Sequence, residues 1–245
     1  MALREEFEQL GNWFFRWRSY LPLVLTALFL IALKNGSGAD IDPNRSFEFF
    51  SLFISFIGLG IRMYAVGCAP RGTSGRNVKE QRADQLNQTG IYSLVRHPLY
   101  LGNFVIWLGI SLFTGSWWLI LITIFIFWFY YEKIMFAEEE YLRRQFGESY
   151  LNWAVRTPAF LPTKLNLWRP PALRFEIKNA LRREYSGFFA IISIFGLMRL
   201  VKDSVAAQKL WVDGVWLNIF LAGLVIYITL MFLKKKTTLL DIRGR

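Results

Sequence analysis

Long apolar stretches separated by short polar segments dominate the sequence. We expect membrane-spanning helices at six of these stretches: residues 20–33, 47–66, 98–113, 116–134, 187–201 and 214–233. Several approach the ~20 apolar residues that a helix needs to cross the hydrocarbon core of a bilayer. The pattern therefore predicts an all-α protein, a polytopic transmembrane helix bundle with about six membrane segments.

The third and fourth of these stretches are expected to form a hairpin. Residues 99–131 carry no charge, and residues 98–134 are too long for one crossing. Thr114-Gly115-Ser116 interrupts them, and each half has about 15–18 residues, or about 23–27 Å at 1.5 Å per residue. This length is slightly short of a ~30 Å hydrocarbon core, so a tight helical hairpin is predicted.

Five further features are expected beside the spans. They are an aromatic and basic interfacial anchor at residues 13–18, a short external loop at 34–46, a polar connector at 71–89, a fourth helix that continues through Gln145 and stops at Gly147, and a basic amphipathic helix near 172–185.

The net charge of +11 comes from 29 Lys and Arg against 18 Asp and Glu. With both termini on one side of the membrane, that side holds 23 of the Lys and Arg and the opposite side holds five. The positive-inside rule then places both termini and the polar motifs in the cytoplasm. The excess charge indicates anionic lipid head groups as partners rather than nucleic acid. We expect an integral membrane protein of the inner or plasma membrane in a bacterium, or of the endoplasmic reticulum in a eukaryote.

Cysteine and histidine usage excludes two kinds of site. The single cysteine, Cys68, excludes an internal disulfide framework and a Cys-rich metal site. His97 is the only histidine and cannot belong to a histidine metal cluster, so no metal is expected. The first 20 residues show no cleavable signal sequence.

The first polar motif surrounds Arg96-His97-Pro98. A residue before proline is pushed out of the helical region, and proline suits the first turn of a helix. His97 is therefore predicted at the mouth of the third span, where a helix N-terminus can bind a carboxylate or phosphate. The alternatives are an interfacial capping role for His97 and a topology anchor for Arg96.

The second polar motif begins with three glutamates, residues 138–140, on the helix that returns beside His97. These glutamates alone would be a solvated helix end, but their return to the membrane face of His97 favours a joint site. Arg156 follows in a proline-bounded stretch, where a guanidinium can bind a carboxylate or phosphate bidentately. The basic residues between Arg169 and Arg183 are interpreted as a membrane-surface face.

Together the two motifs resemble the integral membrane methyltransferases typified by isoprenylcysteine carboxyl methyltransferase and phospholipid methyltransferases. The residues that carry the resemblance are Arg96, His97, Pro98, Tyr100 and Gly102 in the first motif, Glu138, Glu139, Leu142, Phe146, Gly147 and Tyr150 in the second, and then Arg156, Pro158 and Pro162. The resemblance covers roughly residues 58–163, the expected methyltransferase core. Residues 1–57 form an N-terminal membrane region, and residues 164–245 add a basic helix and two spans.

The resemblance implies S-adenosylmethionine as the cofactor, in a pocket that faces the cytoplasm. The residues that it implies around the cofactor are Leu94 and Val95 through their backbone, with His97, Tyr100 and Glu139. The catalytic residues that it implies are Glu138 and Arg156, of which Arg156 orients an anionic acceptor. The connector after Arg71 and the two added C-terminal spans depart from the family pattern, so the acceptor stays open.

The predicted function is methyl transfer to a carboxylate or phosphate of a membrane lipid or prenylated acceptor. One alternative is N-methylation of a phospholipid amine. Another is an enzyme similar to the NADPH-dependent sterol reductases, although Leu99-Tyr100 stands where those have Asn-Tyr. A membrane protein that binds lipid without catalysis is the third. The oligomeric state is left open.

Overall fold

The computed structural model describes residues 2–34, 44–70, 73 and 83–242. Its elements within these residues are helices, which confirms the predicted all-α class. In chain order they are α1 (Leu3–Trp17), α2 (Leu21–Lys34), α3 (Arg45–Cys68), the 3₁₀ turn η1 (Ile91–Ser93), α4 (Pro98–Phe113), α5 (Trp117–Phe146), α6 (Glu148–Ala154), the 3₁₀ turn η2 (Leu165–Leu167), α7 (Ile177–Ala207) and α8 (Gly214–Lys236). Most of the expected external loop, at residues 35–43, and of the connector, at 71–72 and 74–82, lies outside the described residues.

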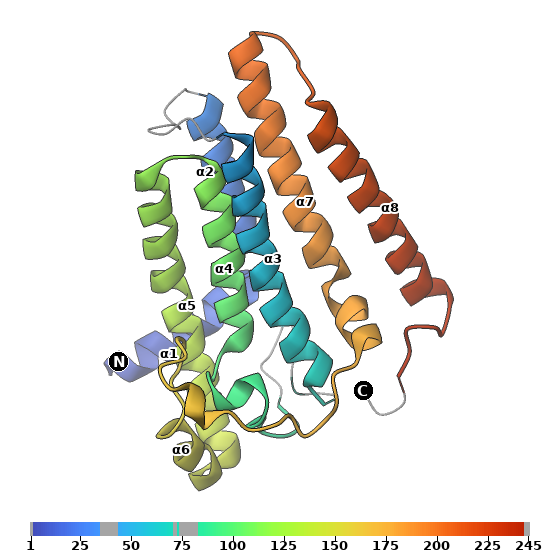
Figure 1. The fold of residues 1–245 in the computed structure, drawn as a ribbon. Coiled ribbons are helices and arrows are strands. Elements are labelled where there is room, and N and C mark those ends of the chain that lie inside the picture. Colours follow the sequence, from blue (N-terminus) through green and yellow to red (C-terminus); the bar gives the residue numbers. More distant parts are fainter. Residues whose placement is uncertain (1, 35–43, 71–72, 74–82, 243–245) are drawn as a thin grey trace.

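Within the described residues, α2, α3, α4, α5, α7 and α8 stand side by side in one bundle, and the first and last described residues lie at the same end of it (Figure 1). That end also carries η1, α6 and the start of α4, so the two polar motifs meet there as predicted. The main apolar core runs through α2, α3, α4, α5, α7 and α8. A second core joins α1, α4 and α5 at the motif end.

The predicted count of about six membrane segments is not confirmed. Three helices in the described chain are long and apolar enough to cross a membrane: α3, α5 and α8. A fourth crossing is counted if α1 and α2, bent by 71° at their junction, form one broken span. α4 has only 16 residues, as its position in a short hairpin requires.

The hairpin between α4 and α5 turns where the sequence predicts. Gly115 has a positive φ of 70°, a backbone conformation that glycine adopts without steric cost. The N–H of Gly115 donates to the carbonyl of Leu112, and the Thr114 hydroxyl accepts from the N–H of Ser116. These bonds pair some of the backbone groups that helix ends leave open, in a turn that is itself buried. α5 then runs to Phe146 and ends at Gly147, also as predicted.

Close packing of α3 on α4 depends on two facing glycines. A Cβ on Gly58 would lie 2.5 Å from the carbonyl oxygen of Gly102, and a Cβ on Gly102 would lie 2.8 Å from that of Gly58. Small residues at facing positions let membrane helices approach closely. The glycine of the first polar motif therefore has a packing role that its sequence position alone did not reveal.

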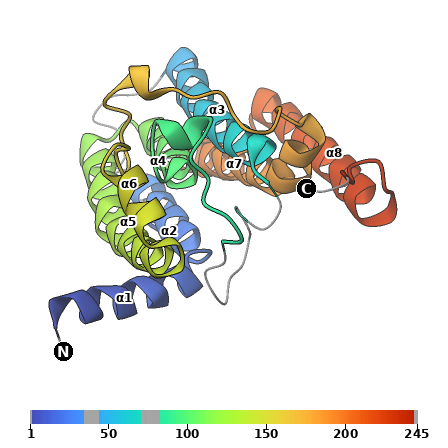
Figure 2. The same cartoon turned by 90° about the horizontal axis from the view of Figure 1, so that it is seen from below.

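α1 lies beside α5 at the motif end, across the direction of the bundle (Figure 2). Its inner face packs Phe7 on Phe136 and Phe14 on Tyr130. Trp13 and Trp17 remain about half exposed on the outer face. The sequence predicted an interfacial anchor here, and the structure adds that this anchor is a helix docked on α5.

The basic amphipathic helix expected near residues 172–185 is not a separate element. Residues 172–176 are non-helical, and from Ile177 the basic segment begins α7 and continues without a break to Ala207. The described chain offers no proline or turn to divide it, and Gln208, with a positive φ of 52°, ends the helix.

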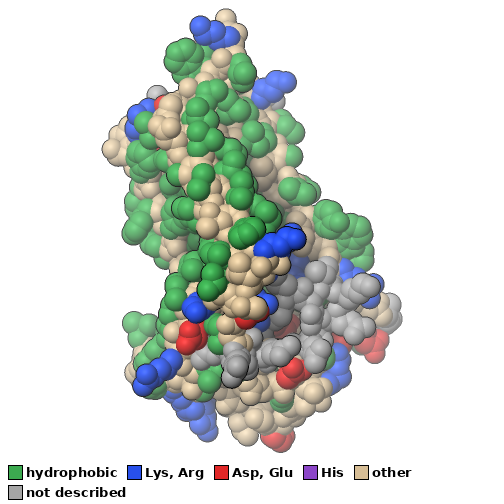
Figure 3. Space-filling model, turned by 90° about the vertical axis from the view of Figure 1, so that its right-hand side faces the viewer, with side chains coloured by type: hydrophobic (Ala, Val, Ile, Leu, Met, Phe, Trp, Pro, Cys, Tyr) green, Lys and Arg blue, Asp and Glu red, His purple; other side chains and the backbone are tan. Residues whose placement is uncertain are grey.

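α8 packs mainly on α7 and exposes an apolar flank (Figure 3). Hydrophobic side chains cover the middle of this flank, and Lys and Arg gather toward both ends. An apolar belt between charged ends fits a helix that faces lipid, because charged groups are costly in the hydrocarbon core. The fold is therefore that of an integral membrane protein.

Candidate functional site

The first polar motif is held in place by backbone hydrogen bonds to the proline-bounded stretch. The N–H of Arg96 donates to the carbonyl of Pro158 at 2.9 Å, and the N–H of His97 donates to that of Ala159 at 3.1 Å. His97 has φ −120° and ψ 60°, outside the helical region, and Pro98 begins α4. The restriction that proline places on the preceding residue thus sets His97 at the mouth of α4, as predicted.

The His97 ring lies between two carboxylates of α5. Its Nε2 is 2.9 Å from Oε1 of Glu139, and its Nδ1 is 3.5 Å from Oε2 of Glu138. The His97 side chain is only 3% exposed. Burial alone would lower the pKa of His97, but the hydrogen bonds to Glu138 and Glu139 outweigh it and raise that pKa to about 9. His97 is therefore a cation near neutral pH, with its Nε2 within hydrogen-bond distance of Glu139 and its Nδ1 in a longer ion pair with Glu138.

Arg96 completes this cluster, although the sequence favoured a topology anchor for it. Its Nε and Nη2 lie 2.9 and 2.8 Å from Oε1 of Glu139, the oxygen that also contacts His97. Its Nη1 donates to the carbonyls of Ala154 and Thr157 at 2.8 and 2.7 Å. Arg96 thus ties α5 to the C-terminal end of α6, where unpaired carbonyls favour a cation.

A pocket of about 210 Å³ opens beside the His97 cluster. Its wall includes His97, Tyr100 and Glu138 from the two motifs. The Tyr100 ring is stacked on the His97 ring, with centroids 5.6 Å apart. Aromatic rings of Tyr92 and Trp153 lie on the same wall, and the indole of Trp153 donates to the carbonyl of Tyr92 at 3.2 Å.

The other predicted site residues lie outside the lining of this pocket. Glu139 is behind it, bonded to Arg96 and His97. The N–H groups of Leu94 and Val95 both donate to the carbonyl of Ile91, so neither is a free donor. The roles predicted for these residues stay predictions.

Arg156 is not brought to His97. It is exposed and lines a second, polar pocket together with Arg169, and Trp153 lies between the two pockets because it lines both. The residue that the sequence selected for an anionic acceptor thus faces a different cavity from the residues that it selected for the cofactor.

Sequence reasoning missed several charged residues of the first pocket. They are Arg18 at the end of α1, Arg62 on α3, and Arg183 and Glu184 on α7. Arg62 had a detectable signal, since it is a charge well inside the predicted span 47–66, and such residues are usually functional. The others were hidden among the many juxtamembrane charged residues of the sequence.

The described residues contain no group of three or more His, Cys, Asp or Glu side chains placed to hold a metal. The donor set of the first pocket instead suits an organic cofactor with mixed charge. A carboxylate, several guanidinium groups and aromatic rings can meet the ammonium or sulfonium, the carboxylate and the adenine of S-adenosylmethionine, respectively.

This fold and site define an integral membrane protein with a pocket, lined by charged and aromatic side chains, at one end of its helix bundle. The sequence model of the phospholipid methyltransferase family matches residues 53–149, which include α4, α5 and both polar motifs up to Ser149. The match confirms the predicted resemblance to that family.

Curated relatives fall into two groups. The chain is 34% identical over 147 residues to a nickel-cobalt-cadmium resistance protein, NccN, of Alcaligenes xylosoxydans xylosoxydans, which covers 60% of this chain and 64% of that protein. It is 29% identical over 112 residues to a protein-S-isoprenylcysteine O-methyltransferase of Schizosaccharomyces pombe, which covers 44% and 48%. For protein-S-isoprenylcysteine O-methyltransferase B of Arabidopsis thaliana the identity is 30% over 116 residues, which covers 46% and 58%. The matched segment spans less than two thirds of each relative, and no solved structure matches the chain.

Proposed function

We propose that this protein transfers a methyl group from S-adenosylmethionine to a polar group of a membrane lipid or prenylated molecule. The observation that carries the proposal is the cluster of His97, Glu138, Glu139 and Arg96, assembled from both motifs beside a polar pocket at one end of an apolar bundle. The match to the phospholipid methyltransferase family supports it.

The bound cofactor supplies an electrophilic methyl group, and the protein's contribution is orientation and exclusion of water. Well-oriented reactants gain roughly 7–11 kcal/mol over a bimolecular reaction in water. Glu138 supplies a carboxylate that attracts a cationic ligand, while Glu139 is engaged by Arg96 and His97. Tyr100, packed on His97, helps to close the pocket.

The charge of His97 favours an acceptor that is already ionised. With a pKa of about 9, His97 carries its proton near neutral pH and does not serve as a base for an ammonium group. A carboxylate or phosphate oxygen needs no deprotonation before it attacks a methyl carbon. The arginines on the pocket wall favour the same anionic class of acceptor.

A phospholipid amine is the second candidate acceptor. The description of the matching family as phospholipid methyltransferase and the carboxylates of Glu138 and Glu184 in the pocket favour it. Mass spectrometry of lipids from cells fed methyl-labelled methionine, with and without the protein, separates the two candidates. Label on carboxylate or phosphate oxygens supports the first, and label only on amine nitrogens supports the second.

We further propose that this end of the bundle faces the cytoplasm. The first and last described residues, the pocket and most of the described Lys and Arg residues lie at that end, and the positive-inside rule favours the cytoplasm for such an end. S-adenosylmethionine is water-soluble and would reach the pocket from that side.

Calorimetry on the detergent-purified protein tests the cofactor. We expect S-adenosylhomocysteine to bind the wild type, and Glu139→Ala to weaken binding by about tenfold or more, because a charge-assisted network worth about 1.5–3 kcal/mol per bond is lost. Glu132→Ala is the matched control, since Glu132 is on the same helix but 46% exposed.

Absence of S-adenosylhomocysteine binding to the wild type would refute the proposed function. Binding of NADPH in its place would support the sterol-reductase alternative, and binding of neither would support a non-enzymatic lipid-binding protein. Equal affinity of Glu139→Ala and Glu132→Ala, with both variants monodisperse, would remove Glu139 from the site.

A further inference from the structure

Arg62 of α3 and Glu184 of α7 form an ion pair on the wall of the His97 pocket. Nε and Nη2 of Arg62 donate to the two carboxylate oxygens of Glu184 at 2.9 and 2.8 Å. Nη1 donates to Oδ1 of Asn103 on α4 at 2.6 Å. Asn103 in turn donates to the hydroxyl of Tyr131 on α5 at 3.1 Å. Four helices thus meet through one arginine.

Two glycines make room for this pair. A Cβ on Gly102 would lie 2.5 Å from Cγ of Arg62, so the arginine side chain crosses α4 where α4 has no side chain. A Cβ on Gly187 would lie 3.3 Å from Oε2 of Glu184, one turn along α7. The glycine of the first polar motif and Arg62 therefore depend on each other.

Burying this ion pair between membrane helices costs free energy. The Glu184 side chain is 3% exposed and that of Arg62 is 20% exposed. Removing two charges from water costs several kcal/mol per ion, and a well-packed apolar pair is often as stable. Arg62 lies six residues before the end of α3, about 9 Å along the helix axis. Charged groups at such a depth are usually part of a ligand path.

Arg62 retains hydrogen-bonding capacity toward the pocket. A guanidinium has five N–H donors, and the contacts with Glu184 and Asn103 use three of them. The pocket, which Arg62 lines, also contains His97 and Glu138. An oxygen anion in that pocket can therefore reach a fixed guanidinium and the reactive end of the site together.

We propose that Arg62 binds an oxyanion, phosphate or carboxylate, of the lipid acceptor, and that Glu184 and Asn103 position it. The proposal rests on the proposed function and names its acceptor-recognition residue. The sequence had assigned acceptor binding to the exposed Arg156, and the proposal assigns it to Arg62, which lines the His97 pocket. It also gives α7, which lies outside the family match, a part in substrate selection.

The test uses the full-length protein in detergent and three lipid probes. The probes are N-acetyl-S-farnesylcysteine for a carboxylate, dioleoyl phosphatidic acid for a phosphate, and dioleoyl phosphatidylethanolamine for an amine. Methyl transfer from labelled S-adenosylmethionine gives kcat and KM, and native mass spectrometry gives lipid binding. Calorimetry gives the affinity for S-adenosylhomocysteine.

We expect the wild type to bind and methylate one of the two oxyanion probes. Arg62→Lys should raise the KM for that probe by about tenfold, because lysine keeps the charge but loses the planar fork. The affinity for S-adenosylhomocysteine should stay within about twofold of wild type. Glu184→Gln should give a smaller rise in KM, since a neutral amide still supports Arg62 but holds it less firmly.

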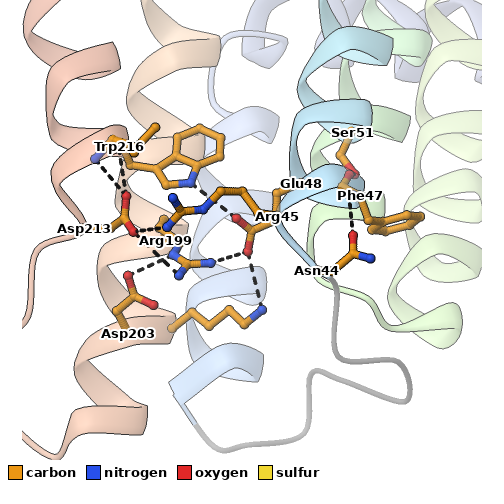
Figure 4. A network of polar contacts seen from close by, with 11 residues as sticks. Asn44, Arg45, Phe47, Glu48, Ser51, Arg199, Asp203, Asp213 and Trp216 are labelled. Carbon is orange, nitrogen blue, oxygen red and sulfur yellow. Dashed lines mark hydrogen bonds and ion pairs between the residues drawn. The ribbon is translucent and has the colours of Figure 1, made fainter.

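Arg199→Lys is the matched control. Arg199 pairs with Glu48 across the same two helices, at the end away from the pocket (Figure 4). This variant should lose stability comparably to Arg62→Lys and keep the KM of the wild type.

Four outcomes would overturn the proposal. The first is an equal KM for Arg62→Lys and Arg199→Lys. The second and third are binding of the amine lipid alone and binding of neither oxyanion lipid. The fourth is loss of S-adenosylhomocysteine affinity in Arg62→Lys, which would assign Arg62 to the cofactor. Wild-type protein that binds an oxyanion lipid but no S-adenosylhomocysteine would instead refute the proposed function alone.

Discussion

α3 and α7 are joined twice by ion pairs of opposite polarity. Near the pocket, α3 supplies the cation and α7 the anion, Arg62 and Glu184. Fourteen residues away on α3, about 21 Å along the axis, α3 supplies the anion and α7 the cation, Glu48 and Arg199. The two pairs have similar components but different surroundings.

The pair away from the pocket is enclosed by protein groups. Glu48 is fully buried, accepts hydrogen bonds from Arg199 and from the indole of Trp216 at 3.3 Å, and forms an ion pair with Lys202 at 3.5 Å. Arg199 also donates to Asp203 at 2.8 Å (Figure 4). Asp213 caps α8 and lies 3.9 Å from Arg199, so the cluster joins three helices.

The two ion pairs have the same chemistry, but their surroundings favour a structural role for the Glu48 pair and a binding role for the Arg62 pair. At the Glu48 end, each carboxylate oxygen of Glu48 contacts a protein donor, and the cluster lines neither the His97 pocket nor the pocket of Arg156. At the Arg62 end, the guanidinium borders a cavity. We therefore expect changes at the first end to affect stability, and changes at the second to affect binding as well.

The largest effect is predicted for Glu48→Leu. Removing one partner of a buried ion pair costs about 3–5 kcal/mol, because the remaining charges lose their compensation. Retained contacts of Arg199 with Asp203 and Asp213 place the loss at the low end of this range. Chemical denaturation in detergent measures the loss, and Glu48→Gln, which keeps the shape and an acceptor, should lose less.

Glu48→Leu also tests the contrast between the two ion pairs. The folded fraction of Glu48→Leu should bind S-adenosylhomocysteine as the wild type does. Weaker binding, or a stability loss below about 1 kcal/mol, would contradict a purely structural role for the Glu48 cluster.

The helices were predictable because their signals are local. Apolar length predicted α2, α3, α4, α5, α7 and α8, and glycine with its polar neighbours predicted the turn at residues 114–116. The separate basic helix near 172–185 was the exception, because composition changes there while the helical backbone does not. A change from charged to apolar residues marks a membrane boundary and need not end a helix.

The site was predictable in part for the same reason. His97, Glu138 and Glu139 belong to two short motifs on one hairpin, so their meeting follows from the hairpin alone. The choice between Arg96 and Arg156 does not, because both arginines stand near prolines. The carbonyls of Ala154 and Thr157 that bind Arg96 are positioned only by the tertiary fold.

The contributions of other segments to the pocket were beyond sequence reasoning. Arg18 comes from the predicted N-terminal region and Glu184 from the predicted C-terminal region, yet both line the pocket of the core. Each resembles many other juxtamembrane charges in sequence. Only the packing of α7 and of the α1–α2 junction against the core distinguishes them.

The second prediction concerns the pH dependence of stability, which we expect to arise from His97 at the pocket end. His97 has a pKa of about 9 in the folded protein, against an ordinary value of 6.5. Below pH 6.5 it is protonated in both states, and its ion pairs contribute fully to stability. As the pH rises from 6.5 through 9 this contribution is lost, by roughly 2–3 kcal/mol.

Thermal denaturation in detergent at pH 6.5 and pH 9.5 measures this loss. The melting temperature of the wild type should be lower at pH 9.5. His97→Gln should be less stable at pH 6.5 but show a smaller difference between the two values, whereas Glu48→Gln should keep the difference of the wild type. An undiminished pH difference in His97→Gln would contradict the raised pKa of His97.

The smallest effect is predicted for an ion pair outside both clusters. Arg144 on α5 donates to Glu8 on α1 at 3.0 Å, and their side chains are 58% and 23% exposed. Exposed pairs of this kind contribute about 0–1 kcal/mol and are screened by salt. Arg144→Ala should therefore change the free energy of unfolding by less than about 1 kcal/mol, and added salt should reduce that change. A loss above about 2 kcal/mol would mean that this pair, rather than the ring contacts of the half-buried Phe7 and Phe14, holds α1 on α5. It would also mean that exposure does not separate weak from strong ion pairs in this protein.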